Sequence, residues 1–189
     1  MEDALALLPC IDAAVAEPAA ALRLTDVGSG SGFPGVVLAI ARPRWTVTLV
    51  ETLGKKARFL EEVCACVPLP NCTTLCARAE AVGRAPATRE AADVVTARAV
   101  AELRVLAELC LPLVRLGGVW VAQKGADPQQ EVADARRAVR LLGGGDMAIL
   151  PVATLGPDGR PFTAVLTHKA APTSGAYPRE AGVPKRAPL

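Results

Sequence analysis

Short runs rich in β-branched and other apolar residues alternate with longer amphipathic stretches along most of the chain. The short runs are expected strands at residues 22–27, 46–50, 73–76, 93–96 and 117–123, and the longer stretches are expected helices at 34–42, 55–67, 102–114 and 129–142. Alternating strands and helices predict βαβ units with right-handed crossovers, which build a parallel sheet covered on both faces.

The last two expected strands, at residues 147–152 and 161–168, are separated by the turn at 156–159. Such a connection is too short for a crossover helix, so these strands should pair antiparallel. The expected fold class is therefore α/β, a doubly wound and mostly parallel sheet with a terminal antiparallel hairpin. This is the outline of the Rossmann-like, class I fold of S-adenosylmethionine-dependent methyltransferases.

The chain has 189 residues, enough for one domain of ordinary size, which we place at residues 1–169. Residues 170–189 are Pro-rich and polar, and we expect an extended, weakly ordered tail. Residues 168–189 carry four basic side chains against one acidic side chain, although the net charge of the whole chain is only +2. The charge of the tail either favours a polyanion or keeps the tail solvated.

Composition excludes several classes of protein. Hydrophobic residues make up 51% of the chain, which argues against disorder, and only 3% is aromatic, which argues against a surface of base-stacking platforms. No uncharged apolar run reaches the roughly 18 residues of a membrane span, and the acidic start lacks a targeting flank. The six cysteines and one histidine show no metal-ligand spacing. We expect a metal-free monomer in the cytoplasm or an organelle matrix.

A glycine-rich segment at 26–35, Asp-Val-Gly-Ser-Gly-Ser-Gly-Phe-Pro-Gly, leaves the first expected strand and opens the first expected helix. An open α/β sheet binds its ligand at this point, and glycines such as Gly28 let the backbone approach the ligand closely. Read from Gly30, the segment also fits the G-x-G-x-x-G pattern of dinucleotide sites. The Asp26 carboxylate would oppose a pyrophosphate but suits the ammonium and sulfonium charges of S-adenosylmethionine. The segment therefore favours this methyl donor over NAD.

Charged residues follow the other expected strands. Glu51 can accept both hydroxyls of an adenosyl ribose, although NAD carries the same ribose and an acid there can also cap a helix. Ala79 and Glu80 follow the third strand, where an adenine edge would lie. Arg98 follows the fourth strand, as a cation on the substrate side or a salt-bridge partner.

The sequence after the fourth expected strand lacks two catalytic elements. It has no Asn/Asp-Pro-Pro-aromatic element, which holds an exocyclic amine in amino-group DNA methyltransferases, and no cysteine nucleophile of the cytosine-C5 type. The acceptor should therefore be nucleophilic already. Guanine N7 fits, because its lone pair needs no base and catalysis can rest on alignment.

Basic residues gather at the start of the second expected helix, where the helix dipole disfavours them. Lys55, Lys56 and Arg58 form this group, and Lys124 ends the fifth expected strand on the same edge. Each of these residues alone would be an ordinary exposed surface charge, but together they predict contact with a phosphate backbone.

Six segments resemble one family, the bacterial small-subunit (16S) ribosomal RNA guanine-N7 methyltransferases, known as RsmG or GidB. They are the glycine-rich segment, Glu-Thr-Leu-Gly-Lys-Lys-Ala-Arg-Phe-Leu (51–60), Arg-Ala-Glu (78–80), Val-Val-Thr-Ala-Arg-Ala-Val-Ala (94–101), Lys-Gly (124–125) and Tyr-Pro-Arg-Glu-Ala-Gly-Val-Pro (177–184). Family members usually carry further helical sequence before the part that matches residues 1–9. They also commonly have an apolar residue where Gln123 stands.

The resemblance implies methyl transfer from S-adenosylmethionine to N7 of a guanosine in small-subunit ribosomal RNA. The expected donor contacts are Gly28, Phe33, Ala79, Glu80 and Arg98, with Glu51 on the ribose. The partner would be ribosomal RNA or the small subunit, contacted by the cations already named and by the tail residues Arg179, Lys185 and Arg186. The alternatives are a methyltransferase with another substrate, a non-catalytic RNA-binding module of the same fold, and an NAD-linked oxidoreductase.

Overall fold

The computed structural model describes residues 2–17, 21–98, 101–156 and 159–189. Within this part, seven strands form one sheet in the order β3-β2-β1-β4-β5-β7-β6. The strands are β1 (Arg23–Val27), β2 (Thr46–Glu51), β3 (Cys72–Cys76), β4 (Ala92–Arg98), β5 (Val114–Lys124), β6 (Ala148–Leu155) and β7 (Pro161–His168). Strands β1 to β5 pair in parallel, while β7 is antiparallel to both β5 and β6. The predicted doubly wound sheet with a terminal antiparallel hairpin is confirmed.

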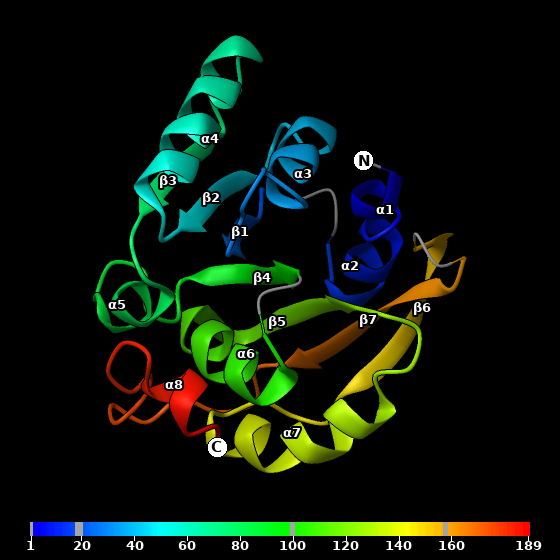
Figure 1. The fold of residues 1–189 in the computed structure, drawn as a ribbon, viewed down its shortest axis with the longest axis vertical. Helices are drawn as coiled ribbons and strands as arrows, with labels where there is room; N and C mark the ends of the chain where they lie inside the picture. Colours follow the sequence, from blue (N-terminus) through cyan, green and yellow to red (C-terminus); the bar gives the residue numbers. More distant parts are fainter. Residues whose placement is uncertain (1, 18–20, 99–100, 157–158) are drawn as a thin grey trace.

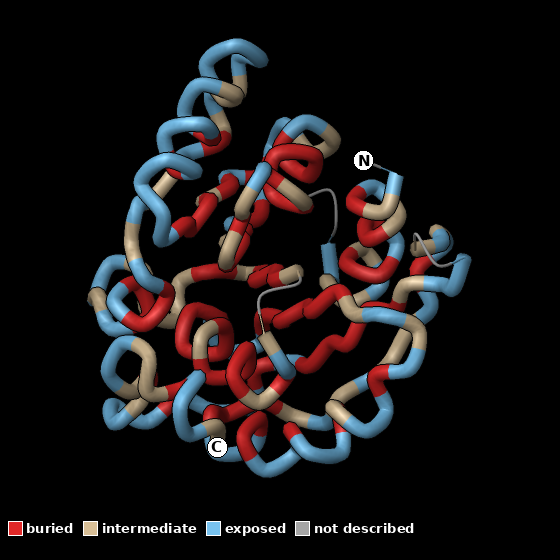
Figure 2. The backbone as a smooth tube through the Cα atoms, viewed as in Figure 1, coloured by how far each residue is buried: buried red, intermediate tan, exposed pale blue. Residues whose placement is uncertain are grey.

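Helices cover both faces of the sheet (Figure 1). One face carries α1 (Glu2–Leu5), α2 (Leu8–Ala14), α3 (Gly35–Ala41) and α4 (Gly54–Cys66), and the other carries α5 (Ala79–Arg84), α6 (Leu103–Cys110) and α7 (Gln129–Leu141). Successive residues of a strand serve opposite faces: Val94 packs in the cluster under α3, and Val95 packs in the cluster under α6. Figure 2 shows the buried residues along the sheet and α4 mostly exposed beyond its edge.

Helices α1 and α2 lie before the first expected strand, where no element was expected, and two later elements also differ from the sequence-based expectation. The helix expected at 102–114 ends at Cys110, and a short 3-10 turn, η1 (Leu111–Leu113), leads into β5. Pro112 cannot donate a helical hydrogen bond, which explains the early end and the longer strand. The second difference is α5, which occupies six residues of an expected loop. The expected turn at 156–159 includes residues 157–158, which lie outside the described part of the chain.

The tail is packed against the domain, contrary to the expectation of an extended, weakly ordered segment. It runs beside α5 and α6 (Figure 1) and ends in α8 (Val183–Arg186). Tyr177 and Leu189 pack against the apolar cluster under α6. Thr173 is buried, and its side chain donates to the carbonyl of Leu142 at 2.6 Å. The partners in these contacts lie far apart in the sequence, so local sequence patterns do not predict them.

Among the described residues, no helix combines the length and apolar character that a membrane crossing requires. The same part of the chain contains no group of three His, Cys, Asp or Glu side chains that could hold a metal ion.

Candidate active site

The predicted ligand-binding residues lie at or after the carboxyl ends of the parallel strands β1 to β5, which place them at one edge of the sheet. Gly28 follows β1, Glu51 ends β2 and Ala79 comes shortly after β3. Arg98 and Lys124 end β4 and β5. This edge, at the carboxyl ends of the strands, is where open α/β sheets bind their ligands.

The glycine-rich loop is held by backbone hydrogen bonds to β2. The N–H groups of Gly28 and Ser29 both donate to the carbonyl of Val50, at 2.9 and 3.2 Å. Gly28 and Gly30 have φ angles of +75° and +57°, which glycine adopts without strain. Because neither residue has a Cβ, a ligand can approach the backbone of this loop closely.

Gly35 begins α3 where the helix approaches β1 and β2. A Cβ at this position would lie 2.3 Å from Leu49 Cδ2 and 2.8 Å from Asp26 Oδ2. The Gly35 N–H donates to Asp26 Oδ2 at 3.2 Å. A larger residue would push α3 away from the strands that position the loop.

Asp26 is turned into the interior rather than toward the ligand edge. It is 1% exposed, and its Oδ1 accepts a hydrogen bond from Thr96 Oγ1 at 2.9 Å. Burial raises the pKa of the Asp26 carboxyl to about 6, although hydrogen bonds from Thr96 and Gly35 act in the opposite direction. This geometry corrects the expectation that the carboxylate itself faces the donor, because Asp26 instead ties β4 to the start of α3.

Glu51 joins the loop to the start of α4. Its Oε2 accepts a hydrogen bond from the Gly30 N–H at 3.0 Å, and its Oε1 accepts one from the Leu53 N–H at 2.9 Å. A carboxylate has about four lone-pair sites, so Glu51 keeps capacity for ribose hydroxyls. Both readings of this residue, a support for the helix start and a ribose ligand, are compatible with the geometry.

Two cavities share Gly28. The larger has about 700 Å³, and its lining joins the glycine-rich loop to the start of α4: Gly28, Ser29, Gly30, Ser31, Phe33, Lys55, Lys56, Phe59 and Arg98. The smaller has about 240 Å³ and includes Ala79, Glu80, Thr52 and Val105 in its lining. The predicted donor contacts are thus divided between the two, with Phe33 and Arg98 in one and Ala79 and Glu80 in the other.

Arg98 and Lys124, the two cations predicted at the ends of the fourth and fifth strands, are both ion-paired. Arg98 Nη1 lies 2.5 Å from Asp3 Oδ2, and its guanidinium lies 5.9 Å from the centre of the Phe162 ring. Lys124 Nζ lies 2.7 Å from Glu131 Oε2 on α7. Arg98 therefore forms the predicted salt bridge and also lines the larger cavity, and its role toward the substrate stays a prediction, whereas Lys124 links β5 to α7.

The start of α4 supplies charge and an aromatic ring to the larger cavity. Lys55 and Lys56 line this cavity, and Arg58 is exposed nearby on the same helix. Phe59 also lines it and is 47% exposed, a residue to which the sequence reasoning gave no role. The signal was its position four residues after Lys55, which places both side chains on one helix face.

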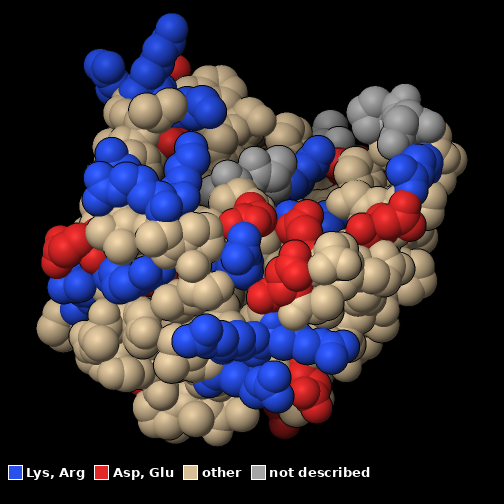
Figure 3. Space-filling model, turned by 60° about the horizontal axis from the view of Figure 1, so that its bottom comes forward, with Lys and Arg blue, Asp and Glu red and all other residues tan. Residues whose placement is uncertain are grey.

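The three tail residues predicted to bind RNA lie in different environments. The Arg179 guanidinium is paired with Glu108 of α6, with Nη2 2.6 Å from Oε2, so its charge is already satisfied within the protein. Lys185 lines the smaller cavity, and Arg186 is exposed beside it. Figure 3 shows the Lys and Arg side chains in separate groups with acidic side chains between them, not as one continuous basic surface.

Comparison with known proteins decides the family. The family model GidB, described as rRNA small subunit methyltransferase G, matches residues 1–154. The chain belongs to this family. Two relatives, each a ribosomal RNA small subunit methyltransferase G, are from Roseiflexus sp. strain RS-1, at 53% identity over 88% of this chain and 70% of the relative, and from Chloroflexus aggregans, at 51% identity over 88% and 69%.

Solved structures of methyltransferases share the fold of this GidB chain. A variant of the 16S rRNA adenine-N1 methyltransferase from Catenulisporales acidiphilia, solved with S-adenosylmethionine, has a TM-score of 0.63 at 18% identity and covers 88% of this chain and 93% of that one. A S-adenosylmethionine-dependent O-methyltransferase from Thermotoga maritima has a TM-score of 0.64 at 15% identity and covers 91% and 66%. The GidB chain thus has the class I methyltransferase fold.

Proposed function

We propose that this chain is a methyltransferase that transfers the methyl group of S-adenosylmethionine to N7 of a guanosine in small-subunit (16S) ribosomal RNA. The observation that carries the proposal is the larger cavity, which joins the glycine-rich loop to the basic start of α4. Membership of the GidB family supports it, because the curated relatives are named for the small-subunit ribosomal RNA.

The residues at the sheet edge fit the donor. The smaller cavity is lined by Ala79 and Glu80 and would take the adenosine end, with Glu51 beside it for the ribose. The loop from Gly28 to Phe33 would take the amino-acid end. S-adenosylmethionine supplies a methyl group on a positively charged sulfur, which a nucleophile can attack directly.

The side chains of this chain then act by alignment and charge. Lys55 and Lys56 bind phosphate groups of the RNA, and Phe59 offers a ring face to a base. Among the described residues that line the larger cavity, none is a carboxylate, histidine or cysteine that could remove a proton or attack a base. That lining suits guanine N7, whose lone pair needs no deprotonation. Methylation at N7 makes the guanine base cationic. The Asp3 carboxylate, paired with Arg98, neutralises the positive charge of Arg98 close to this base.

The partner in this proposal is ribosomal RNA, free or in the small subunit, and the protein acts as a monomer in the cytoplasm. The test is to incubate small subunits that lack N7-methylguanosine with methyl-labelled donor and to map the modified base by borohydride and aniline cleavage. We expect label at N7 of one guanosine. Label on another atom would assign a different acceptor, and donor binding without transfer would indicate a non-catalytic RNA-binding module.

A further inference from the structure

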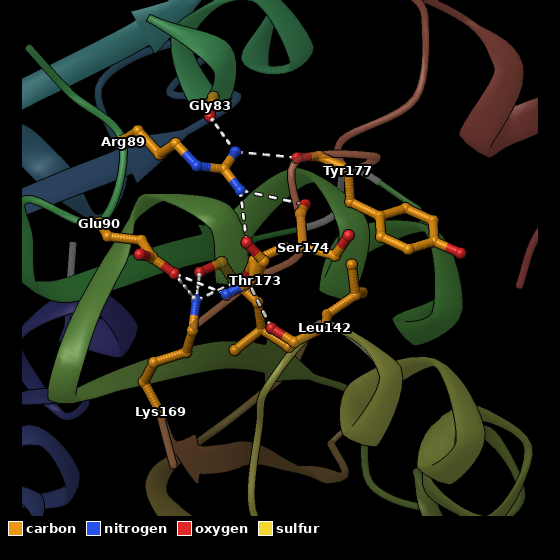
Figure 4. Close-up of polar contacts among 9 residues, drawn as sticks. Gly83, Arg89, Glu90, Leu142, Lys169, Thr173, Ser174 and Tyr177 are labelled. Carbon is orange, nitrogen blue, oxygen red and sulfur yellow. Dashed lines mark hydrogen bonds and ion pairs between the residues drawn. The ribbon is translucent and has the colours of Figure 1, made fainter. Parts of the chain in front are cut away.

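The tail lies beyond the residues matched by the family model, yet a buried charged residue fixes its beginning. Lys169 has a fully buried side chain, and its Nζ donates to the Leu111 carbonyl at 2.5 Å. This Nζ also donates to Thr173 Oγ1 at 2.6 Å (Figure 4). The same Nζ lies 3.1 Å from Glu90 Oε1, which also accepts from the Thr173 N–H at 2.7 Å. A buried ammonium group is tolerated only when it is paired in this way, so these contacts hold the first turn of the tail in a single position.

Arg89 fixes the next part of the tail. Its Nη1 donates to the carbonyls of Gly83 and Tyr177 at 3.0 and 2.8 Å, and its Nη2 donates to the carbonyls of Thr173 and Ser174 at 2.7 and 3.1 Å (Figure 4). One guanidinium therefore ties three tail residues to α5. The planar fork of arginine suits this arrangement, because it presents several donors in fixed directions.

A third anchor lies closer to the end of the chain. Glu108 in α6 is fully buried, and its carboxylate receives the Arg179 N–H at 2.7 Å as well as the Arg179 guanidinium through Nε and Nη2. On α5, Arg84 Nε donates to the Pro178 carbonyl at 2.8 Å. These contacts direct the following residues toward the ligand edge of the sheet.

The anchored tail ends at the smaller cavity. Gly182, Pro184 and Lys185 line it together with Ala79 and Glu80. The Gly182 N–H donates to Glu80 Oε1 at 2.9 Å, so the tail also fixes the orientation of a predicted donor ligand. Pro184 is buried, whereas the neighbouring Arg186 is exposed and is not among the described residues that line the cavity.

The geometry points to the C-terminal tail as a wall of the donor site, in which Pro184 and Lys185 close the adenosine pocket and Gly182 orients Glu80. This inference rests on the proposed function, because the adenosine of the donor is the group that the smaller cavity would take. It assigns Lys185 to the donor pocket instead of the RNA surface. It also gives a role to a segment that carries no part of the glycine-rich loop.

Isothermal titration of the whole 189-residue chain tests the proposal with two ligands. S-adenosylhomocysteine contains both ends of the donor, and 5′-methylthioadenosine contains only the adenosine end. We expect the double variant Pro184→Ala/Lys185→Ala to lower the affinity for both ligands by a similar factor, about tenfold, because the tail contacts only the adenosine end that both ligands share. The matched control Arg186→Ala, which removes the neighbouring charge outside the cavity, should bind both ligands within about twofold of the wild type.

A chain that ends at Ser174 gives a second measurement, since it keeps Lys169 and Thr173 but loses the wall. If this chain folds, judged by a cooperative thermal transition, its affinity for both ligands should fall at least as far as that of the double variant. If the shortened chain does not fold, the ligand affinities of the double variant alone test the proposal. Wild-type affinity in the double variant would overturn the tail proposal, and a wild type that binds neither ligand would instead overturn the proposed donor site.

Discussion

Thr96 donates a hydrogen bond from its hydroxyl group to Asp26 Oδ1 at 2.9 Å, between partners in register on the parallel strands β4 and β1. The other oxygen of the same carboxylate accepts the first N–H of α3, that of Gly35. Three elements that shape the loop therefore meet on one buried carboxylate. This arrangement predicts an unusual contribution of Asp26 to stability.

Asp26→Asn should change how stability depends on pH. The carboxyl pKa is about 6 in the folded protein against an ordinary value of 3.8, so the native state binds more protons than the unfolded state between these two pH values. The free energy of unfolding contributed by Asp26 therefore falls as the pH rises through this window, by about 3 kcal/mol in total, and asparagine lacks this loss. Urea unfolding at about pH 4.5 and about pH 7.5 should show the variant gaining stability relative to the wild type at the higher pH. An equal difference at both pH values would contradict the raised pKa.

Arg179→Ala should destabilise the protein but leave RNA binding unchanged, because the Arg179 guanidinium is paired with Glu108. The substitution leaves the buried Glu108 carboxylate without its guanidinium partner, which costs about 3 kcal/mol in the free energy of unfolding. Arg186→Ala removes an exposed charge and should change that free energy by less than about 0.5 kcal/mol. Chemical denaturation measures both variants. If the Arg179→Ala protein has wild-type stability and its RNA affinity depends less steeply on salt, Arg179 contacts RNA and the prediction is wrong.

Gly35→Ala should damage both folding and donor binding. The added Cβ would lie 2.3 Å from Leu49 Cδ2, so α3 must shift, and the cost should reach about 2 kcal/mol. Gly54→Ala is the matched control, since its Cβ would meet nothing within 4 Å at the start of α4. Alanine there should be neutral or stabilising by up to about 1 kcal/mol. Thermal unfolding and S-adenosylhomocysteine titration would detect the contrast, and equal behaviour of the two variants would refute it.

Lys55→Ala/Lys56→Ala should weaken RNA binding while sparing the donor. Two lost phosphate contacts should reduce the slope of log affinity against log salt by about 1.5 and leave the affinity for S-adenosylhomocysteine nearly unchanged. Arg136→Ala/Arg137→Ala removes the same charge from the exposed side of α7 and serves as the control. Fluorescence anisotropy with a fragment of small-subunit RNA, across a salt series, measures the slope. Equal slopes for the two double variants would remove the start of α4 from the RNA surface.

The sequence predicts the sheet well because its strands are short β-branched runs separated by clear breaks. Helix α5 escapes prediction because it has six residues and contains Gly83, which weakens any helical signal. The tail escapes for a different reason: Lys169 pairs with Glu90 and Arg179 pairs with Glu108, and these partners lie far apart in the chain. Such pairings are fixed by tertiary packing, which local composition does not reveal.

The candidate site is predictable in position but not in side-chain direction. The segment at 26–35 and Glu51 predict the edge of the sheet at which both cavities lie, because glycine-rich turns after a first strand have a known place in this architecture. The side chains of successive strand residues point to opposite faces, and the sequence does not settle that Asp26 turns inward to Thr96. Phe59 is missed because an exposed aromatic residue on a helix resembles any other surface residue until the cavity is seen.

Because Gly182, Pro184 and Lys185 line the smaller cavity, this pocket is completed by a segment that is synthesised well after Glu80, which precedes Gly182 by 102 residues. Domains fold during synthesis from the N-terminal side, so β1 to β5 and the glycine-rich loop are synthesised, and can begin to pack, before these residues. In a nascent chain this pocket therefore stays open until the segment with Gly182, Pro184 and Lys185 has been synthesised and has packed against α5 and α6.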